Sequence, residues 1–82
     1  MSNNTLQTLQ SILVPLLRDY SLGDFTPEMR LREELQVDSM FMIEAAVAIE
    51  DEFGIPELTD QEMAKLRTVG DVVALIEDKA RA

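Results

Sequence analysis

The sequence has no cysteine and no histidine among its 82 residues. Without cysteine, the chain can form no disulfide, bind no metal through a thiolate and offer no thiol nucleophile of its own. Without histidine, it lacks the side chain that most often serves as general base and as ligand to transition metals. Both absences weigh against an enzyme and against a transition-metal protein.

Long apolar runs, linkers and repeats are also missing. The longest apolar runs, residues 45–49 and 72–76, are far too short to span a bilayer. The first residues, Met-Ser-Asn-Asn-Thr, have neither the basic start nor the apolar core of a signal peptide. With 46% apolar and 28% charged residues, the composition is that of a globular protein. We therefore expect a single domain over residues 1–82, located in the cytoplasm and making no membrane contact.

Basic residues are few, and none occurs in the middle of the chain. The net charge is −9, from 7 basic and 16 acidic residues. The stretch 33–64 contains no lysine or arginine but ten acids: Glu33, Glu34, Asp38, Glu44, Glu50, Asp51, Glu52, Glu57, Asp60 and Glu62. Such a field repels nucleic acids and attracts basic protein surfaces. We expect no nucleic-acid partner and interpret the acids as a protein-docking surface, the alternative being a merely solvated surface.

Two helices are predicted in the first two thirds of the chain. Leucines at helical spacing indicate a helix over about residues 4–19. Pro15 lacks an N–H group, so this helix either bends there or splits into two pieces. A second helix is predicted over residues 39–53, between a cap at Asp38 or Ser39 and the breakers that follow.

Two further helices and one long connection complete the expected fold. Thr59 and Glu62 fit a capping box, which predicts a short helix over residues 60–66. Thr68 can cap a last helix. Its inner face would hold Val69, Val72, Val73, Ile76 and Ala80. The aperiodic connection 20–38 has as apolar anchors Phe25, Met29, Leu31 and Leu35. The expected fold class is therefore all-α: a four-helix bundle with a short third helix and a long loop between helices 1 and 2.

The predicted second helix has two apolar sides. At about 100° per residue, the side assigned to the core holds Met42, Ala45, Ala46, Ile49 and Phe53. The opposite side holds Met40, Ile43, Glu44, Val47 and Asp51. Apolar residues beside acids are typical of a transient docking surface. The alternative is that neighbouring helices bury both sides.

The hydroxyl of Ser39 is presented at the start of this helix without catalytic equipment. A serine nucleophile needs a base and an orienting group, and no histidine or Gly-x-Ser-x-Gly elbow is present. Lys65 or Lys79 could in principle act as a base, but no spacing points to either. No calcium-loop pattern occurs among the acids. We expect no catalytic residue and no metal site, and a serine that another enzyme modifies; the alternative is that Asp38 and Ser39 merely cap the helix.

An ordered set of short motifs surrounds this serine. It comprises Leu35-x-x-Asp38-Ser39-Met40, Glu44, Ile49-Glu50-Asp51-Glu52-Phe53, an Ile-Pro loop and Thr68-Val69-Gly70-Asp71. Over residues 31–76 this set resembles the acyl carrier protein family. The resemblance implies the acyl-carrier-protein bundle and a 4′-phosphopantetheine arm, which a phosphopantetheinyl transferase joins from coenzyme A to Ser39. It also implies that acyl groups are held as thioesters on the thiol of this arm.

The resemblance also implies the partners of a monomeric carrier. These are the transferase, an acyl-loading ligase or acyltransferase, and ketosynthase-type or other pathway enzymes. They would dock on Asp38, Met40, Ile43, Glu44, Val47 and Asp51. Departures from the family pattern favour a free-standing carrier of a specialised fatty acyl or polyketide pathway: Met40 replaces leucine, and Phe41 stands where fatty-acid carriers have an acid. A dedicated aminoacyl or peptidyl carrier and a non-modified helical adaptor are the alternatives.

Overall fold

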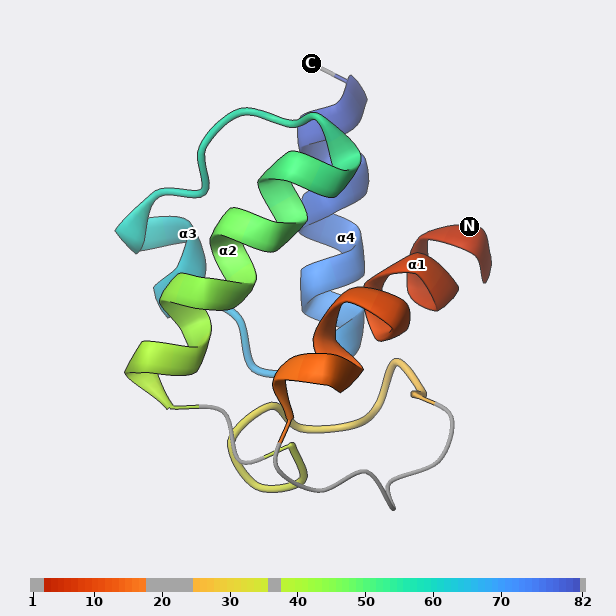
Figure 1. The fold of residues 1–82 in the computed structure, drawn as a ribbon, viewed down its shortest axis with the longest axis vertical. Helices are drawn as coiled ribbons and strands as arrows, with labels where there is room; N and C mark the ends of the chain where they lie inside the picture. Colours follow the sequence, from red (N-terminus) through yellow and green to blue (C-terminus); the bar gives the residue numbers. More distant parts are fainter. Residues whose placement is uncertain (1–2, 18–24, 36–37, 82) are drawn as a thin grey trace.

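The fold is all-α, as predicted. A computed structural model describes residues 3–17, 25–35 and 38–81. Its elements are α1 (Asn3–Leu13), the 3-10 helix η1 (Val14–Leu16), α2 (Ser39–Phe53), α3 (Asp60–Ala64) and α4 (Val69–Arg81) (Figure 1). The short third helix and the long connection between the first two helices are confirmed. None of the helices in the described ranges is both long and apolar enough to cross a membrane.

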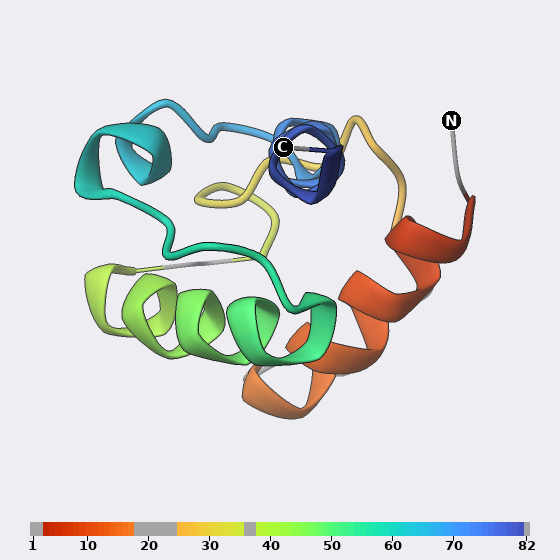
Figure 2. The ribbon, with the colours of Figure 1, turned by 90° about the horizontal axis from the view of Figure 1, so that it is seen from above.

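α2 and α4 form the centre of the bundle. α1 contacts both of them, and α3 lies on the other side of this pair, away from α1 (Figures 1 and 2). The segment 25–35 passes below the bundle, near the first residues of α2 and of α4 (Figure 1).

The first helix changes its winding ahead of Pro15. α1 ends at Leu13, and η1 continues for one tighter turn that has the proline in its first positions. The N–H of Leu17 closes this turn on the carbonyls of Leu13 and Val14, both at 3.1 Å. Pro15 has no N–H to donate, so the α-helical pattern gives way to a 3-10 turn. The last two residues of the predicted helix, 18 and 19, lie outside the described residues.

Both ends of α2 follow the sequence signals. Asp38 has extended backbone angles, and its Oδ1 accepts a hydrogen bond from the N–H of Phe41 at 2.8 Å. Asp38 is therefore the cap, and Ser39 is the first helical residue. At the other end Gly54 adopts φ 62°, a left-handed conformation, and donates its N–H to Glu50. Glycine adopts this conformation without the steric cost that a Cβ would add.

Capping side chains also define α3 and α4. The Thr59 hydroxyl accepts from the N–H of Glu62 at 3.1 Å, and the Glu62 carboxylate accepts from the N–H of Thr59 at 2.9 Å. The predicted capping box is therefore confirmed. α3 ends at Ala64, two residues early, because the N–H of Lys65 bonds the carbonyls of Glu62 and Met63 in a tightened last turn. Thr68 caps α4 by accepting from the N–H of Asp71 at 3.2 Å.

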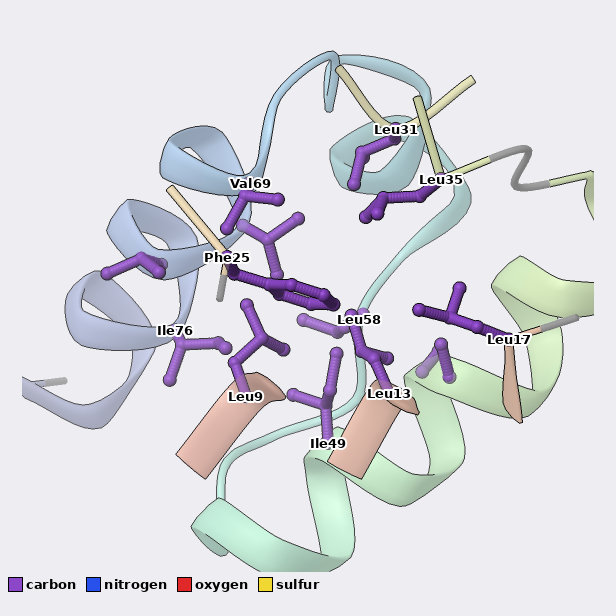
Figure 3. Packing of buried hydrophobic residues seen from close by; sticks show 14 of the residues in the cluster. Leu9, Leu13, Leu17, Phe25, Leu31, Leu35, Ile49, Leu58, Val69 and Ile76 are labelled. Atoms are coloured by element: carbon purple, nitrogen blue, oxygen red, sulfur yellow. The ribbon is translucent and has the colours of Figure 1, made fainter. Parts of the chain in front are cut away.

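The core combines residues from α1, α2 and α4 with anchors from the connecting segments (Figure 3). Its buried residues are Leu9, Leu13, Leu17, Phe25, Leu31, Leu35, Ala45, Ala46, Ile49, Ile55, Leu58, Val69, Val72, Val73 and Ile76. Met42 and Phe53 are half-buried against this cluster rather than fully inside it. The placement of Ala80 on the inner face is wrong: it is exposed, because the last turn of α4 extends beyond the core.

Backbone hydrogen bonds tie the long connection to the start of α4. The N–H of Leu31 bonds the carbonyl of Arg67 at 2.9 Å, and the N–H of Val69 bonds the carbonyl of Met29 at 2.8 Å. The N–H of Gly70 bonds the carbonyl of Pro27 at 2.9 Å, and a Cβ on this glycine would lie 3.0 Å from the Pro27 oxygen. Glycine thus permits the close approach. Segments nearly forty residues apart are held together.

Candidate functional site

Ser39 is exposed at the N-terminus of α2. The first intrahelical bond runs from the N–H of Met42 to the carbonyl of Asp38 at 3.0 Å, and the N–H of Phe41 bonds the Asp38 side chain. The N–H groups of Ser39 and Met40 have no intrahelical acceptor, as is usual in a first turn. The serine hydroxyl is thus presented to solvent at the positive end of the helix dipole.

A groove of about 720 Å³ opens beside this serine. Its walls come from the connection, α2, α3 and the segment before α4. The apolar residues that line it are Leu31, Met42, Ile43, Met63, Ala64 and Leu66. The polar residues are Arg30, Arg32, Glu33, Ser39, Asp60, Arg67 and Thr68. No lysine is among the residues that line the groove, and Lys79 bonds the Glu62 carboxylate at 2.9 and 3.0 Å.

Three arginines stand around the groove in a chain of net charge −9. The sequence analysis did not single out Arg30, Arg32 or Arg67. A signal was present, however: Arg32 is the last basic residue before the stretch without lysine or arginine, and Arg67 follows closely after its end. The hydrogen bonds between the connection and the start of α4 bring the two borders of this stretch together.

The side of α2 that faces away from the core is exposed, as the docking-surface interpretation predicts. Met40, Ile43 and Val47 are 68%, 60% and 54% exposed. Glu44 and Asp51 are exposed beside them. The alternative in which neighbouring helices bury both sides of α2 is therefore wrong. Apolar side chains with acids around them form one continuous strip that begins next to Ser39.

A small apolar cavity lies beneath the groove. Its volume is about 20 Å³. Four residues line both the cavity and the groove: Leu31, Met42, Met63 and Leu66. These four side chains therefore lie where the groove and the cavity adjoin.

Comparison with known proteins identifies the family. Residues 7–76 match the family model described as the phosphopantetheine attachment site. An acyl carrier protein of Helicobacter hepaticus is 36% identical over 74 residues, which are 90% of this chain and 95% of that protein. The chain belongs to the acyl carrier protein family. The resemblance carried by Asp38-Ser39 and the motifs around it is thereby confirmed.

Two mycobacterial carrier proteins with more specialised names are also similar to this chain. The meromycolate extension acyl carrier proteins of Mycobacterium tuberculosis and Mycolicibacterium aurum are each 46% identical to it over 55 residues. Those residues are 67% of this chain, but only 47% and 56% of the two relatives. The chain thus spans about half the length of these curated relatives.

The cofactor of the family, 4′-phosphopantetheine, is attached covalently. The start of α2 fits such a group in three respects. A hydroxyl is exposed at a helix N-terminus, where a phosphate is favoured. A groove beside it is large enough to receive an extended chain. Arginines around the groove complement a phosphate anion.

Proposed function

We propose that Ser39 carries the phosphopantetheine arm and that the protein presents acyl intermediates to the enzymes of a specialised fatty acyl or polyketide pathway. The single observation that carries the proposal is the exposed Ser39 hydroxyl at the start of α2, open to the groove. Ser11, the other serine with a described side chain, lies in α1 and donates its hydroxyl to the carbonyl of Gln7 at 3.1 Å.

The residues around Ser39 support attachment by another enzyme. The serine must lose its proton, but the chain has no histidine, and Asp38 Oδ1 is engaged by the N–H of Phe41. The base would therefore come from the transferase. Once attached, the phosphate would meet the helix N-terminus, an interaction worth about 0.3–1 kcal/mol at an exposed site. When bound, the arm supplies the thiol that a cysteine-free chain lacks, and this thiol holds acyl groups as thioesters.

Partner enzymes would dock on the exposed strip of α2. The strip comprises Asp38, Met40, Ile43, Glu44, Val47 and Asp51. Its charge suits basic surfaces, which the transferase, an acyl-loading ligase or acyltransferase, and ketosynthase-type or other pathway enzymes would provide. The protein would act as a cytoplasmic monomer with residues 1–82 as a single carrier domain. It would catalyse no reaction itself and bind neither nucleic acid nor membranes.

The name of the relatives supports a specialised pathway. The mycobacterial relatives described above are named meromycolate extension acyl carrier proteins. Phe41, at a position where fatty-acid carriers usually have an acid, supports the same assignment. The competing hypotheses are a carrier of aminoacyl groups and a non-modified helical adaptor.

Intact-mass spectrometry tests the attachment. The protein is incubated with coenzyme A and a broad-specificity phosphopantetheinyl transferase, and one added arm is expected. Ser39→Ala should gain no mass, whereas Ser11→Ala, which also removes an exposed serine, should be modified as the wild type is. An unmodified wild type under conditions that convert a control carrier would contradict the proposal and favour the adaptor. Loading of the arm by an aminoacyl ligase but by no acyl ligase would favour the aminoacyl carrier.

A further inference from the structure

The groove beside Ser39 is lined by three arginines and two acids, Glu33 and Asp60, in a chain that is otherwise strongly acidic. Three of the seven basic residues of the chain, Arg30, Arg32 and Arg67, line it. The docking strip of α2, by contrast, is acidic. Three cations next to the acidic strip suit an anionic group better than the basic surfaces that the strip attracts.

The backbone that carries the arginines is fixed on both sides of the groove. Arg30 forms an isolated antiparallel bridge with Thr68, and the N–H of Leu31 bonds the carbonyl of Arg67. Arg30 and Arg32 therefore flank a residue whose own backbone is bonded to Arg67. The three cations arise from segments that the fold holds together, so their proximity is built into the described structure.

Two of the acids near these arginines in sequence, Glu34 and Asp71, bond the backbone rather than a guanidinium group. Glu34 accepts from the N–H of Arg30 at 2.9 Å, and Asp71 accepts from the N–H groups of Arg67 and Thr68 at 3.0 and 3.1 Å. Arg30 makes one loose ion pair, with Glu33 at 3.6 Å, in which both side chains are more than 60% exposed. Within the described part of the chain, neither Arg32 nor Arg67 forms an ion pair.

We propose that Arg32 and Arg67, with Arg30 beside them, form a phosphate-binding rim that holds the phosphodiester of the arm, so that the arm rests in the groove between transfers. This inference rests on the proposed attachment at Ser39. Guanidinium groups match phosphate oxygens because they donate two parallel hydrogen bonds. The arginines are positioning residues, since they orient the arm and take no part in its chemistry.

A phosphate on Ser39 is favoured over any anion from solution. Ser39 lines the same groove as the three arginines, so a phosphate ester on its hydroxyl is tethered at the edge of this groove. Confinement of this kind corresponds to effective concentrations of about millimolar or more. An exposed arginine–phosphate pair shifts an equilibrium by a factor of roughly 1.5 to 5. Two such pairs would therefore keep most arms at the rim at low salt, while leaving them free to move to a partner enzyme.

Phosphorus NMR of the holo protein tests the rim. In Arg32→Gln/Arg67→Gln, the ³¹P signal should shift and narrow as the arm gains mobility. Salt at about 0.5 M, where screening extends over only a few ångströms, should shift the wild-type signal in the same direction. Arg81→Gln removes one arginine charge at the C-terminal end of α4, far from the groove, and should leave the signal unchanged (Figure 1). An identical ³¹P signal in the wild type and the double variant would overturn the rim.

Two controls separate this inference from the attachment itself and from a free anion. Intact mass is measured first: if Ser39 carries no arm, the proposed function fails, whereas an arm with an unperturbed ³¹P signal contradicts the rim alone. The arginine Nε–Hε signals of the holo protein should differ from those of the apo protein. Inorganic phosphate at a few millimolar should leave the apo signals almost unchanged. If it reproduced the holo shifts, the rim would be a free-anion site and the proposal would be wrong.

Discussion

Asp38 caps α2, and in the proposed function its charge also attracts partner enzymes. Substitutions of this residue can separate the two roles. Its carboxylate caps α2 through the bond from the N–H of Phe41, and it is also one of the charges of the docking strip. Asp38→Asn keeps a side-chain oxygen that can accept from Phe41 but removes the charge. Asp38→Ala removes both. The pair therefore distinguishes the loss of a cap from the loss of a charge.

The expected stability changes follow from the capping geometry. The bond is 2.8 Å long and exposed, and replacing such a cap with alanine costs about 0.5–2 kcal/mol. For a domain of this size, each kcal/mol lowers the melting temperature by about 4–8 °C. Asp38→Ala should thus melt about 5 °C below the wild type. Asp38→Asn should stay within about 0.5 kcal/mol of it, because asparagine and aspartate are similar caps. Thermal and urea unfolding followed by circular dichroism measure both changes.

The rate of arm attachment gives the second readout. If the Asp38 charge attracts the transferase, Asp38→Asn should slow modification at low salt, and the difference should shrink as salt is added. Asp38→Ala should be slowed at least as much. An Asp38→Ala variant as stable as the wild type would refute the capping argument. Equal modification rates in all three proteins at low salt would refute the role of Asp38 in docking.

Three further outcomes test other parts of the structure. Glu44→Lys and Val47→Asp should each slow modification and acyl transfer. The free energy of unfolding measured in urea should change by no more than about 0.5 kcal/mol, since both side chains are exposed. Unchanged kinetics would place docking elsewhere. Gly54→Ala should lower the free energy of unfolding by about 1–2 kcal/mol because the φ of Gly54 is 62°. Gly54→Asn should lower it less, since asparagine tolerates this left-handed conformation better than alanine. Equal losses in the two variants would contradict a cost that arises from the positive φ. Hydrogen bonds from the Thr59 N–H and from Lys79 lower the pKa of Glu62. The ionised Glu62 carboxylate therefore stabilises the fold above the ordinary glutamate pKa. This stabilisation is lost as the pH falls through the lowered pKa of the folded state. Glu62→Gln should lack this part of the acid dependence in urea unfolding, and an identical acid dependence would refute it.

Local signals predicted most of the fold. Three features depend on residues within a few positions of one another: the cap at Asp38, the end of α2 before Gly54 and the Thr59–Glu62 capping box. Each of them can therefore be predicted from a short stretch of sequence. Pro15 was expected to bend or split the first helix, and the structure shows that a 3-10 turn follows α1 there. The extent of the inner face of α4 was overestimated at Ala80 because periodicity does not show where the neighbouring helices end.

Long-range contacts account for what the sequence did not reveal. Two walls of the groove beside Ser39 are joined by the bond from the N–H of Leu31 to the carbonyl of Arg67, and no periodic pattern encodes a pairing across such a separation. The ion pair between Lys79 and Glu62 is likewise formed between separate helices. Ser39 could be proposed as the attachment residue because the ordered motifs around it, from Leu35 to Asp71, resemble those of acyl carrier proteins.

The size of α3 has a consequence for the interior of the bundle. α3 has five residues and alone among the four described α-helices contributes no buried residue. It is held by its capping box and by Lys79, and isolated helices of this length are unstable in water. Detaching α3 should therefore need less free energy than detaching any other helix. Met63 of α3 lines both the groove and the small cavity. An apolar cargo that entered the interior would therefore bind the state in which α3 is detached and would increase the population of that state. The length of the acyl chain would set the size of this increase.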